Sequence, residues 1–391
     1  MKNKKRLSLL LLLLISMSSA HADDYAKDAF NPVVTAVVSQ TIAPEARGGS
    51  MGDIGVATEP DVNSQAWNPA KYPFCISKGG VAINYTPWLR QLVNDIDLGY
   101  LAGYYRIGDY QALSGSLRFF SLGEVSSNDI TAHPYEMAVD VAYSRMLSEK
   151  LSAAIALRYI YSNIDGNVSN DLHAGSAFAA DIAMYYNNYI MLGNRESMLG
   201  FGLNISNIGS KINFGEDYSY FIPTTLRLGV GLTVPLNEYN KLAFNVEASK
   251  LLVPSKPLKK IIDGEEEEDD EEYNERIRKE YYEISSISGI FKSFHDSPNG
   301  FKGEMQEILW GVGAEYTYND RFSLRAGYHH ESESQGNRKY FTFGAGFKMS
   351  IFSIDAGYVV SASSSNPLDQ TIRVSLGFDM DGIKDLFGRR R

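Results

Sequence analysis

The stretch "TTLRLGVGLTV", residues 224–234, alternates apolar residues with small or polar ones. In an extended chain one face would carry Leu226, Leu228, Val230, Leu232 and Val234, and the other Thr225, Arg227, Gly229, Gly231 and Thr233. Successive side chains of a β-strand point to opposite sides, whereas a helix would mix the two sets. The stretch is therefore predicted to be a strand with one apolar face.

The same alternation recurs through the rest of the chain. We identify fourteen segments, at residues 79–87, 97–107, 110–121, 135–147, 150–163, 177–188, 196–207, 223–234, 240–250, 306–318, 321–331, 339–349, 351–361 and 370–379. Most have the length of a tilted membrane strand, about 9–11 residues or more, rather than the 5 or 6 typical of soluble sheets. An even number of strands is also usual for a bacterial barrel made from one chain.

Short and long connections alternate between these segments. Tight turns are expected at Gly108-Asp109, Ser148-Glu149, Asn319 and Ser350, and longer connections at 122–134, 164–176, 208–222, 251–305 and 362–369. If the N-terminus lies in the periplasm, every long connection falls on the cell surface, as in outer-membrane barrels. A soluble β-sandwich is the alternative that alternation alone would allow. The lengths and the connections favour an all-β fold, a 14-stranded antiparallel transmembrane β-barrel over residues 79–379.

Charge, cysteine content and the N-terminal residues restrict the possible functions and the cellular location. The net charge of −10 argues against nucleic-acid binding, which needs a basic surface. Cys75 is the single cysteine, so no internal disulfide is possible. The basic "KNKKR", an apolar run and "SSAHA" predict a signal peptide over residues 1–22, so that the chain is exported, cleaved and placed in the cell outer membrane. Residues 380–391 are predicted to be a C-terminal tail.

The faces opposite the apolar ones carry charges of both signs. They are Arg118, Arg158, Arg227, Arg325 and Arg373 with Asp140, Asp181, Glu247, Glu315 and Asp355. These side chains are expected to point into the lumen, because a charge facing lipid is costly. Aromatic residues near strand ends, among them Tyr104, Tyr105, Phe119, Phe120, Tyr185 and Tyr186, are expected to form interfacial girdles. The charges fit either a water-filled channel or a lumen laced with ion pairs.

A glycine-rich segment, "ARGGSMGDIGVATEPDVNSQAWNPAKY" at residues 46–72, precedes the first predicted strand. Irregular backbone is tolerated inside a barrel, where protein surrounds it instead of lipid. Residues 23–78 are therefore expected to form an N-terminal periplasmic or plug segment. Gly52 and Gly55 are expected where the backbone closely approaches the wall or adopts a positive φ.

Six residues of that segment, Arg47, Gly52, Asp53, Gly55, Asn68 and Pro69, lie in a signature that resembles FadL-like barrels. Within them, the chain is most similar to the PorV/PorQ group of the Bacteroidetes type IX secretion system. The resemblance implies a non-enzymatic outer-membrane cargo shuttle that binds the C-terminal signal domain of secreted proteins. The implied partners are the giant translocon of SprA/Sov type, the attachment complex with PorU, PorQ and PorZ, and outer-membrane lipid. The broader FadL-like resemblance implies the alternative, an uptake channel for hydrophobic small molecules.

Two motifs that suggest other chemistry lack the context they need. "GGSMG", Gly48 to Gly52, matches the nucleophile elbow, but no strand-to-helix pattern surrounds Ser50. His329 and His330 are adjacent in a predicted strand, so they point to opposite faces, and no metal-ligand spacing pairs with them. The sequence therefore predicts no enzyme, no catalytic residue, no cofactor and no metal site.

Residues 263–284, "DGEEEEDDEEYNERIRKEYYEI", form an acidic tract inside the longest connection. A solvated loop is the ordinary interpretation, because like charges repel. Divalent cations or a basic partner are the other options, although no EF-hand pattern is present. The candidate cargo- or partner-binding residues are Trp88, Leu89 and Leu92 of "PWLRQLV", and Glu265, Glu266, Glu267, Glu268, Asp269 and Asp270.

Overall fold

The computed structural model describes residues 30–90, 93, 95–127, 130–164, 173–262, 266–362 and 368–383. The predicted signal peptide and most of the predicted tail lie outside these residues. Within the described chain, no helix combines the length and apolar character needed to cross a membrane.

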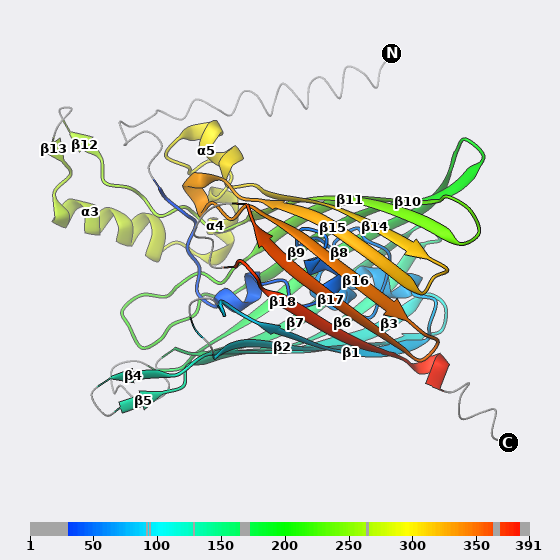
Figure 1. Cartoon of the computed structure of the whole chain (residues 1–391). Helices are drawn as coiled ribbons and strands as arrows, with labels where there is room; N and C mark the ends of the chain where they lie inside the picture. The colour runs from blue at the N-terminus through cyan, green and yellow to red at the C-terminus, as the bar shows by residue number, and fades with distance from the viewer. Residues whose placement is uncertain are drawn as a thin grey trace, which may run out of the picture.

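Fourteen antiparallel strands close into a barrel, with β1 paired to β18 (Figure 1). The barrel strands are β1 (Gly79–Pro87), β2 (Ile96–Ile107), β3 (Gln111–Leu122), β6 (Tyr135–Ser148), β7 (Leu151–Asn163), β8 (Gly175–Leu192), β9 (Arg195–Gly209), β10 (Thr225–Pro235), β11 (Asn240–Leu251), β14 (Leu309–Tyr318), β15 (Phe322–His330), β16 (Tyr340–Lys348), β17 (Phe352–Ser361) and β18 (Ile372–Asp379). Each of the fourteen predicted segments overlaps one of them. The predicted barrel is confirmed.

The outer surface of the barrel is apolar. On β10, Leu228 is 47% exposed and Val230 is 42% exposed, although both are aliphatic. The same holds for outward-facing residues on other strands, such as Val81, Ile83, Leu113, Val141, Ile155, Leu157, Phe178, Ile182, Phe244, Val246, Leu324, Phe343 and Ile354. A continuous apolar belt of this kind is the surface that a membrane barrel presents to lipid.

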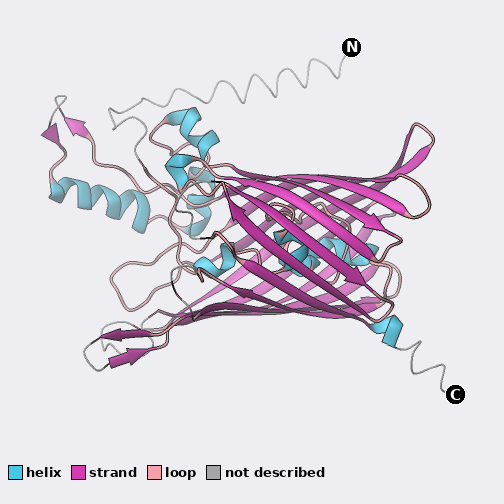
Figure 2. Cartoon of the chain, viewed as in Figure 1, coloured by secondary structure: helices cyan, strands magenta, loops and turns pink. Residues whose placement is uncertain are grey.

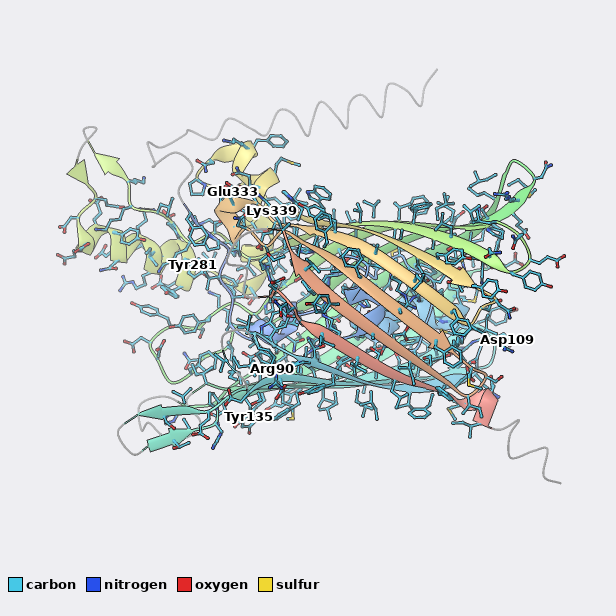
Figure 3. The ribbon with its side chains drawn as sticks, viewed as in Figure 1. Arg90, Asp109, Tyr135, Tyr281, Glu333 and Lys339 are labelled. Atoms are coloured by element: carbon cyan, nitrogen blue, oxygen red, sulfur yellow. The ribbon has the colours of Figure 1, made fainter. Side chains whose placement is uncertain are left out.

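The two ends of the barrel differ (Figure 1). One end, called the loop end below, carries the small sheets and most of the helices outside the barrel, apart from a short helical turn at residues 380–383, which follows β18 at the other end. They are β4 (Val125–Ser127), β5 (Ile130–Ala132), β12 (Ile261–Ile262), β13 (Glu266–Glu267), α3 (Asp270–Ile277), η4 (Arg278–Tyr282), α4 (Ser286–Lys292), α5 (Gly300–Gln306) and η5 (Glu333–Gln335). The other end, the turn end, carries short turns; Figure 3 shows Asp109 there, opposite Arg90, Tyr281 and Glu333.

Short helices that precede β1 lie inside the ring of strands, enclosed by the barrel (Figure 2). We call residues 37–78 the luminal segment. It contains η1 (Val38–Thr41), α2 (Ala46–Gly49), η2 (Ser64–Ala66) and η3 (Pro69–Phe74). Tyr72 is fully buried and stacks on Tyr104 of β2 at 4.6 Å between ring centroids. The core of the molecule is thus the packing of this segment against the inner barrel wall.

The aromatic girdle prediction is wrong for half of its residues. Tyr104, Phe120 and Tyr185 are buried inside, whereas Tyr105 and Phe119 are exposed on the outer surface. Adjacent residues of a strand must point to opposite sides, so each pair of aromatics supplies one ring to the lipid face and one to the interior.

Candidate functional site

The luminal segment is joined to the barrel wall by buried ion pairs. Arg47 contacts Glu315 of β14 at 2.8 Å and Asp61 of the segment itself at 2.8 Å. Glu315 also pairs with Arg325 of β15 at 2.5 Å, and Arg325 reaches Asp355 of β17 at 2.7 Å. A chain of alternating charges therefore links the segment to three strands.

A second set of contacts fixes residues 52–56. The Gly52 amide donates to the Thr342 hydroxyl of β16 at 2.8 Å. Asp53 pairs with Arg373 of β18 at 2.8 Å. The amides of Gly55 and Val56 both donate to the Glu247 carboxylate of β11, each at 2.8 Å. Backbone donors that lie far from water are thus satisfied by side chains of the wall.

Gly52 and Gly55 both sit where a larger residue would not fit. Gly52 has φ of +85°, and a Cβ there would lie 2.6 Å from the Tyr328 carbonyl oxygen. A Cβ on Gly55 would lie 2.3 Å from the Trp67 ring. Gly52 shows both features expected from the sequence, the close approach to the wall and the positive φ, whereas Gly55 is crowded by Trp67 of the luminal segment itself and not by the wall.

The "WNPA" motif forms the start of η3. Asn68 caps it, because its side-chain oxygen accepts from the Ala70 amide at 3.0 Å, and Pro69 occupies the first helical turn. The Asn68 side-chain nitrogen donates to the carbonyl oxygens of Val56 at 3.0 Å and Met184 of β8 at 2.9 Å. One side chain thus ties the helix start to both the glycine-rich turn and the wall.

Most of the remaining luminal charges are also paired, whereas Arg118 of β3 donates to the backbone carbonyl oxygens of Ser39 and Ile42. Arg158 of β7 contacts Asp140 of β6 at 3.3 Å and Asp181 of β8 at 2.9 Å. Arg227 of β10 lies 3.6 Å from Glu247. Of the two options that the sequence left open, the structure shows the lumen laced with ion pairs.

Among the cavities inside the barrel, two lie on opposite sides of the luminal segment. The cavity toward the loop end has a volume of about 150 Å³ and is lined by Trp67, Arg118 and Arg227, among others. The cavity toward the turn end has a volume of about 400 Å³, and Arg47 and Asp320 are among its lining residues.

The two motifs with possible chemistry have structural roles here. Ser50 is buried at the end of α2 and donates to the Arg47 carbonyl oxygen at 2.9 Å. His329 faces inward, stacked on Tyr340, whereas His330 faces outward, stacked on Trp310. The histidines therefore lie on opposite faces, as the sequence indicates.

Trp88 and Leu89 lie at the loop end, directly after β1. Both are half-buried, and both pack against a cluster of Tyr340, Val359 and Leu368. Leu89 has a positive φ of 52°. Leu92 lies outside the described residues.

The acidic tract is partly folded. Glu268 is buried and binds the Arg276 guanidinium in two places, one at 2.8 Å, while Asp269 and Asp270 are exposed. Asp270 pairs with Lys259 at 2.6 Å. The backbone of Glu266 and Glu267 forms β13, and Glu265 lies outside the described residues. The role of Glu268 in stabilising the loop itself was not predicted; the available signal was an acid two residues before a helical pattern that has Arg276 in its last turn.

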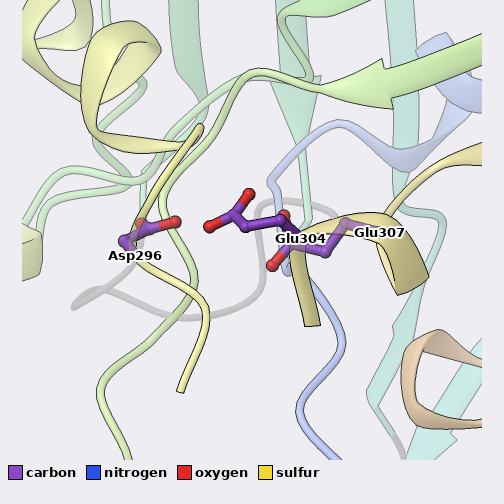
Figure 4. A group of neighbouring side chains, drawn as sticks. All are labelled: Asp296, Glu304 and Glu307. Atoms are coloured by element: carbon purple, nitrogen blue, oxygen red, sulfur yellow. The ribbon is translucent and has the colours of Figure 1, made fainter. Parts of the chain in front are cut away.

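Three other acidic side chains lie together at the base of this loop: Asp296, Glu304 and Glu307 (Figure 4). A lysine of the wall, Lys250, enters the group, pairing with Glu304 at 3.0 Å and with Glu307. Glu307 also accepts from the Ser255 hydroxyl at 2.8 Å. The group therefore fastens α5 to the top of β11.

Comparisons with known proteins give one family. The model of the family described as type IX secretion system protein PorV matches residues 25–258, more than half of the chain. No curated protein matches the sequence. Among solved structures, the Pseudomonas putida toluene transporter TodX is similar over 86% of this chain and 96% of its own, with 11% identity and a TM-score of 0.48. A Pseudomonas aeruginosa FadL homologue is similar over 90% of this chain and 100% of its own, with 11% identity and a TM-score of 0.44. Structural similarity at 11% identity and these TM-scores says nothing about which molecules the barrel binds or transports.

Proposed function

Because this chain belongs to the PorV family of type IX secretion system proteins, we propose that it is a non-enzymatic cargo shuttle of the outer membrane. It binds the C-terminal signal domain of secreted proteins at the translocon and delivers them to the attachment complex with PorU, PorQ and PorZ. The loop end faces the cell exterior and the turn end faces the periplasm. The chain reaches the membrane by export and loses residues 1–22.

The observation that carries this proposal is the filled lumen. The luminal segment is bonded to strands on several sides of the barrel, through Arg47, Asp53 and Asn68. Opening a path through the lumen would separate buried ion pairs, which costs about 3–5 kcal/mol for each charge left alone. The segment acts as a fixed plug, and recognition takes place on the loops.

The loop end offers both apolar and charged contacts to cargo. Trp88, Leu89 and Leu92 supply apolar anchors, since binding energy concentrates in desolvated aromatic and aliphatic residues. Glu265, Glu266, Glu267, Asp269 and Asp270 supply a field that attracts a basic patch. Glu268 acts indirectly, by holding Arg276 and with it the start of η4.

Co-purification tests the proposal. The tagged protein is isolated from detergent-solubilised membranes, and the chains that accompany it are identified by mass spectrometry. We expect secreted proteins that share a C-terminal domain. Their absence, together with uptake of a labelled hydrophobic compound that depends on this protein, would reject the shuttle in favour of the FadL-like channel.

A pair of variants separates specific from general effects. Trp88→Ala at the loop end is expected to reduce the recovered cargo. Tyr239→Ala removes a ring that is 56% exposed at the turn end and is expected to leave recovery unchanged. The shift in gel mobility on boiling, measured for both variants, shows whether each barrel is folded.

A further inference from the structure

Two short helices at the loop end present their apolar side chains outward. On α4, Ile287 is 55% exposed and Phe291 is 68% exposed, and Phe294 just beyond its end is 49% exposed. Residues spaced by three or four lie on one side of a helix. The opposite side carries Gly289 and Ser293, which are buried.

The second helix, α5, has the same inverted arrangement. Phe301 is 74% exposed and Met305 is 51% exposed, four residues apart on one side. The opposite side carries Gly303 and Glu307, both buried. Below, "the apolar face" means Ile287, Phe291, Phe294, Phe301 and Met305.

Anchors on the buried sides set this orientation. A Cβ on Gly289 would lie 2.8 Å from the Phe221 ring, so a larger residue could not replace it there. Glu307 of the α5 end is held by Lys250 of β11 and by the Ser255 hydroxyl. Turning either helix over would bury its phenylalanines but break these contacts, so the exposure of the apolar face is built into the loop.

The position of α5 indicates what covers its apolar side. The helix ends at Gln306, and β14 begins three residues later at Leu309. The next residue, Trp310, is 40% exposed on the outer surface and stacks on His330 at 5.0 Å between centroids. Tryptophan on the outside of a barrel near a strand end marks the level of the lipid headgroups. Figure 1 shows α5 at the rim, beside the loop-end portions of β11 and β14.

We propose that the apolar face lies in the headgroup region of the membrane and that α4 and α5 form an interfacial element continuous with the lipid-facing belt. Helices of this kind bury phenylalanine and leucine just below the headgroups and carry lysine beside them. Lys292 follows Phe291 directly, and Lys302 follows Phe301. This inference is independent of the proposed cargo function, because it concerns the lipid surface around the barrel.

Nitroxide scanning of the full-length protein in vesicles of phosphatidylcholine and phosphatidylglycerol tests this proposal. Cys75 is buried, so single cysteines introduced by Phe291→Cys and Phe301→Cys can be labelled selectively. Collisions with oxygen, which concentrates in lipid, are compared with collisions with a nickel chelate, which stays in water. We expect the nitroxide at both positions to collide more often with oxygen than with the nickel chelate.

Two control positions keep the result specific. Val125 on β4 is 56% exposed, and Val125→Cys is expected to report water. Ser288→Cys, beside the apolar face on α4, is expected to collide with nickel more than position 291 does. If positions 291 and 301 match Val125, the lipid assignment is wrong and a protein partner is the occupant of this face. In unlabelled protein, Phe301→Trp is expected to be quenched by brominated lipid more than the parent chain, and equal quenching would contradict the proposal.

Discussion

Gly52 combines a positive φ with a Cβ position that the wall already fills. Gly52→Ala is expected to destabilise the barrel by more than the roughly 1–2 kcal/mol that a left-handed backbone costs an L-residue, because the Tyr328 carbonyl must also move. The measurement is the fraction of heat-shifted barrel on a gel across a urea series. Gly193→Ala is the matched control, since Gly193 also has a positive φ but has nothing within 4 Å of its Cβ position. Equal midpoints for the two variants would contradict the close packing.

Glu315 neutralises two arginines inside the lumen, Arg47 and Arg325. Glu315→Gln leaves these buried charges undercompensated and is expected to cost about 3–5 kcal/mol. Asp320→Asn breaks an exposed pair with Lys241 at the turn end and is expected to cost at most about 1 kcal/mol. Unfolding midpoints in urea compare the two. If Asp320→Asn lowers the stability as much as Glu315→Gln does, burial of the Glu315 ion pairs contributes nothing to the stability of the barrel.

At the residue scale, the sequence predicted on which side of a strand a residue lies better than it predicted which residue it contacts. Alternation alone assigned Arg227 and Glu315 to the lumen, because a two-residue period determines the side of a strand. It did not predict that Arg47 meets Glu315, since 268 residues separate them and the contact depends on how the luminal segment runs through the barrel. That Gly52 and Gly55 occupy positions without room for a side chain was predictable, because glycine alone lacks a Cβ and so fits where neighbouring atoms come this close.

At the scale of the element, β10 turns one set of side chains toward lipid and the other set toward the lumen. Leu228→Arg places a charge on the lipid face and is expected to cost about 2–4 kcal/mol if the residue lies near the midplane. Tyr239→Arg, on an exposed residue at the turn end, is expected to cost about 0–1 kcal/mol. Folding yield into vesicles of fixed thickness measures both. Equal yields would mean that Leu228 does not contact lipid.

The connection between α4 and α5 is expected to respond to pH. Burial, and then the nearby charges of Glu307 and Glu304, raise the pKa of Asp296 from 3.8 to about 7. The folded loop therefore holds this proton more tightly than the unfolded chain, and the stabilisation, present at low pH, is lost as the pH rises through about 7. Lys250 and Lys292 are the cations facing the group and offset part of this loss.

A nitroxide at position 301 measures the effect as mobility that increases from about pH 5 to about pH 8. Asp296→Asn keeps an acceptor for the Ser255 amide but removes the titration. It is expected to show the low-pH mobility throughout. A pH response that survives in this variant would assign the effect to another group.

Regular elements were predictable and the loop elements were not. Fourteen strands were identified because each is long and one-sided in its hydrophobicity. The acidic tract was interpreted as a solvated loop, whereas it contains α3, with Asp270, Glu271 and Glu272 in the first turn, where acids favour a helix. α4 and α5 were missed because each has only seven residues, too few for a helical period to be recognised in the sequence.

At the scale of the whole molecule, the acidic tract at residues 263–284 is expected to give the loop end a negative electrostatic field. Neutralising exposed acids of the tract, with Asp269→Asn, Glu271→Gln and Glu272→Gln together, is expected to weaken cargo-domain binding modestly and to flatten its salt dependence, because salt screens such fields. The control makes the same charge change at the turn end, with Asp109→Asn, Glu149→Gln and Glu196→Gln. Affinity is measured across a salt series. An identical response of both triple variants would remove the loop end from recognition, and loss of all binding in the first would show that the acids outweigh the apolar anchors.

The pairing of β18 with β1 has a consequence for how the molecule is made. Asp53 and its partner Arg373 are 320 residues apart, and the Ala46 amide bonds to Ser375 across 329 residues. The segment that emerges first during synthesis thus waits for its final neighbours until nearly the whole polypeptide has been delivered. Contacts this distant in sequence form slowly, because a long stretch of chain must be ordered before they can form. The order of folding steps therefore matters. The barrel must stay open until the luminal segment is in place, and pairing of β18 with β1 then closes the wall and completes the contacts of that segment at the same step.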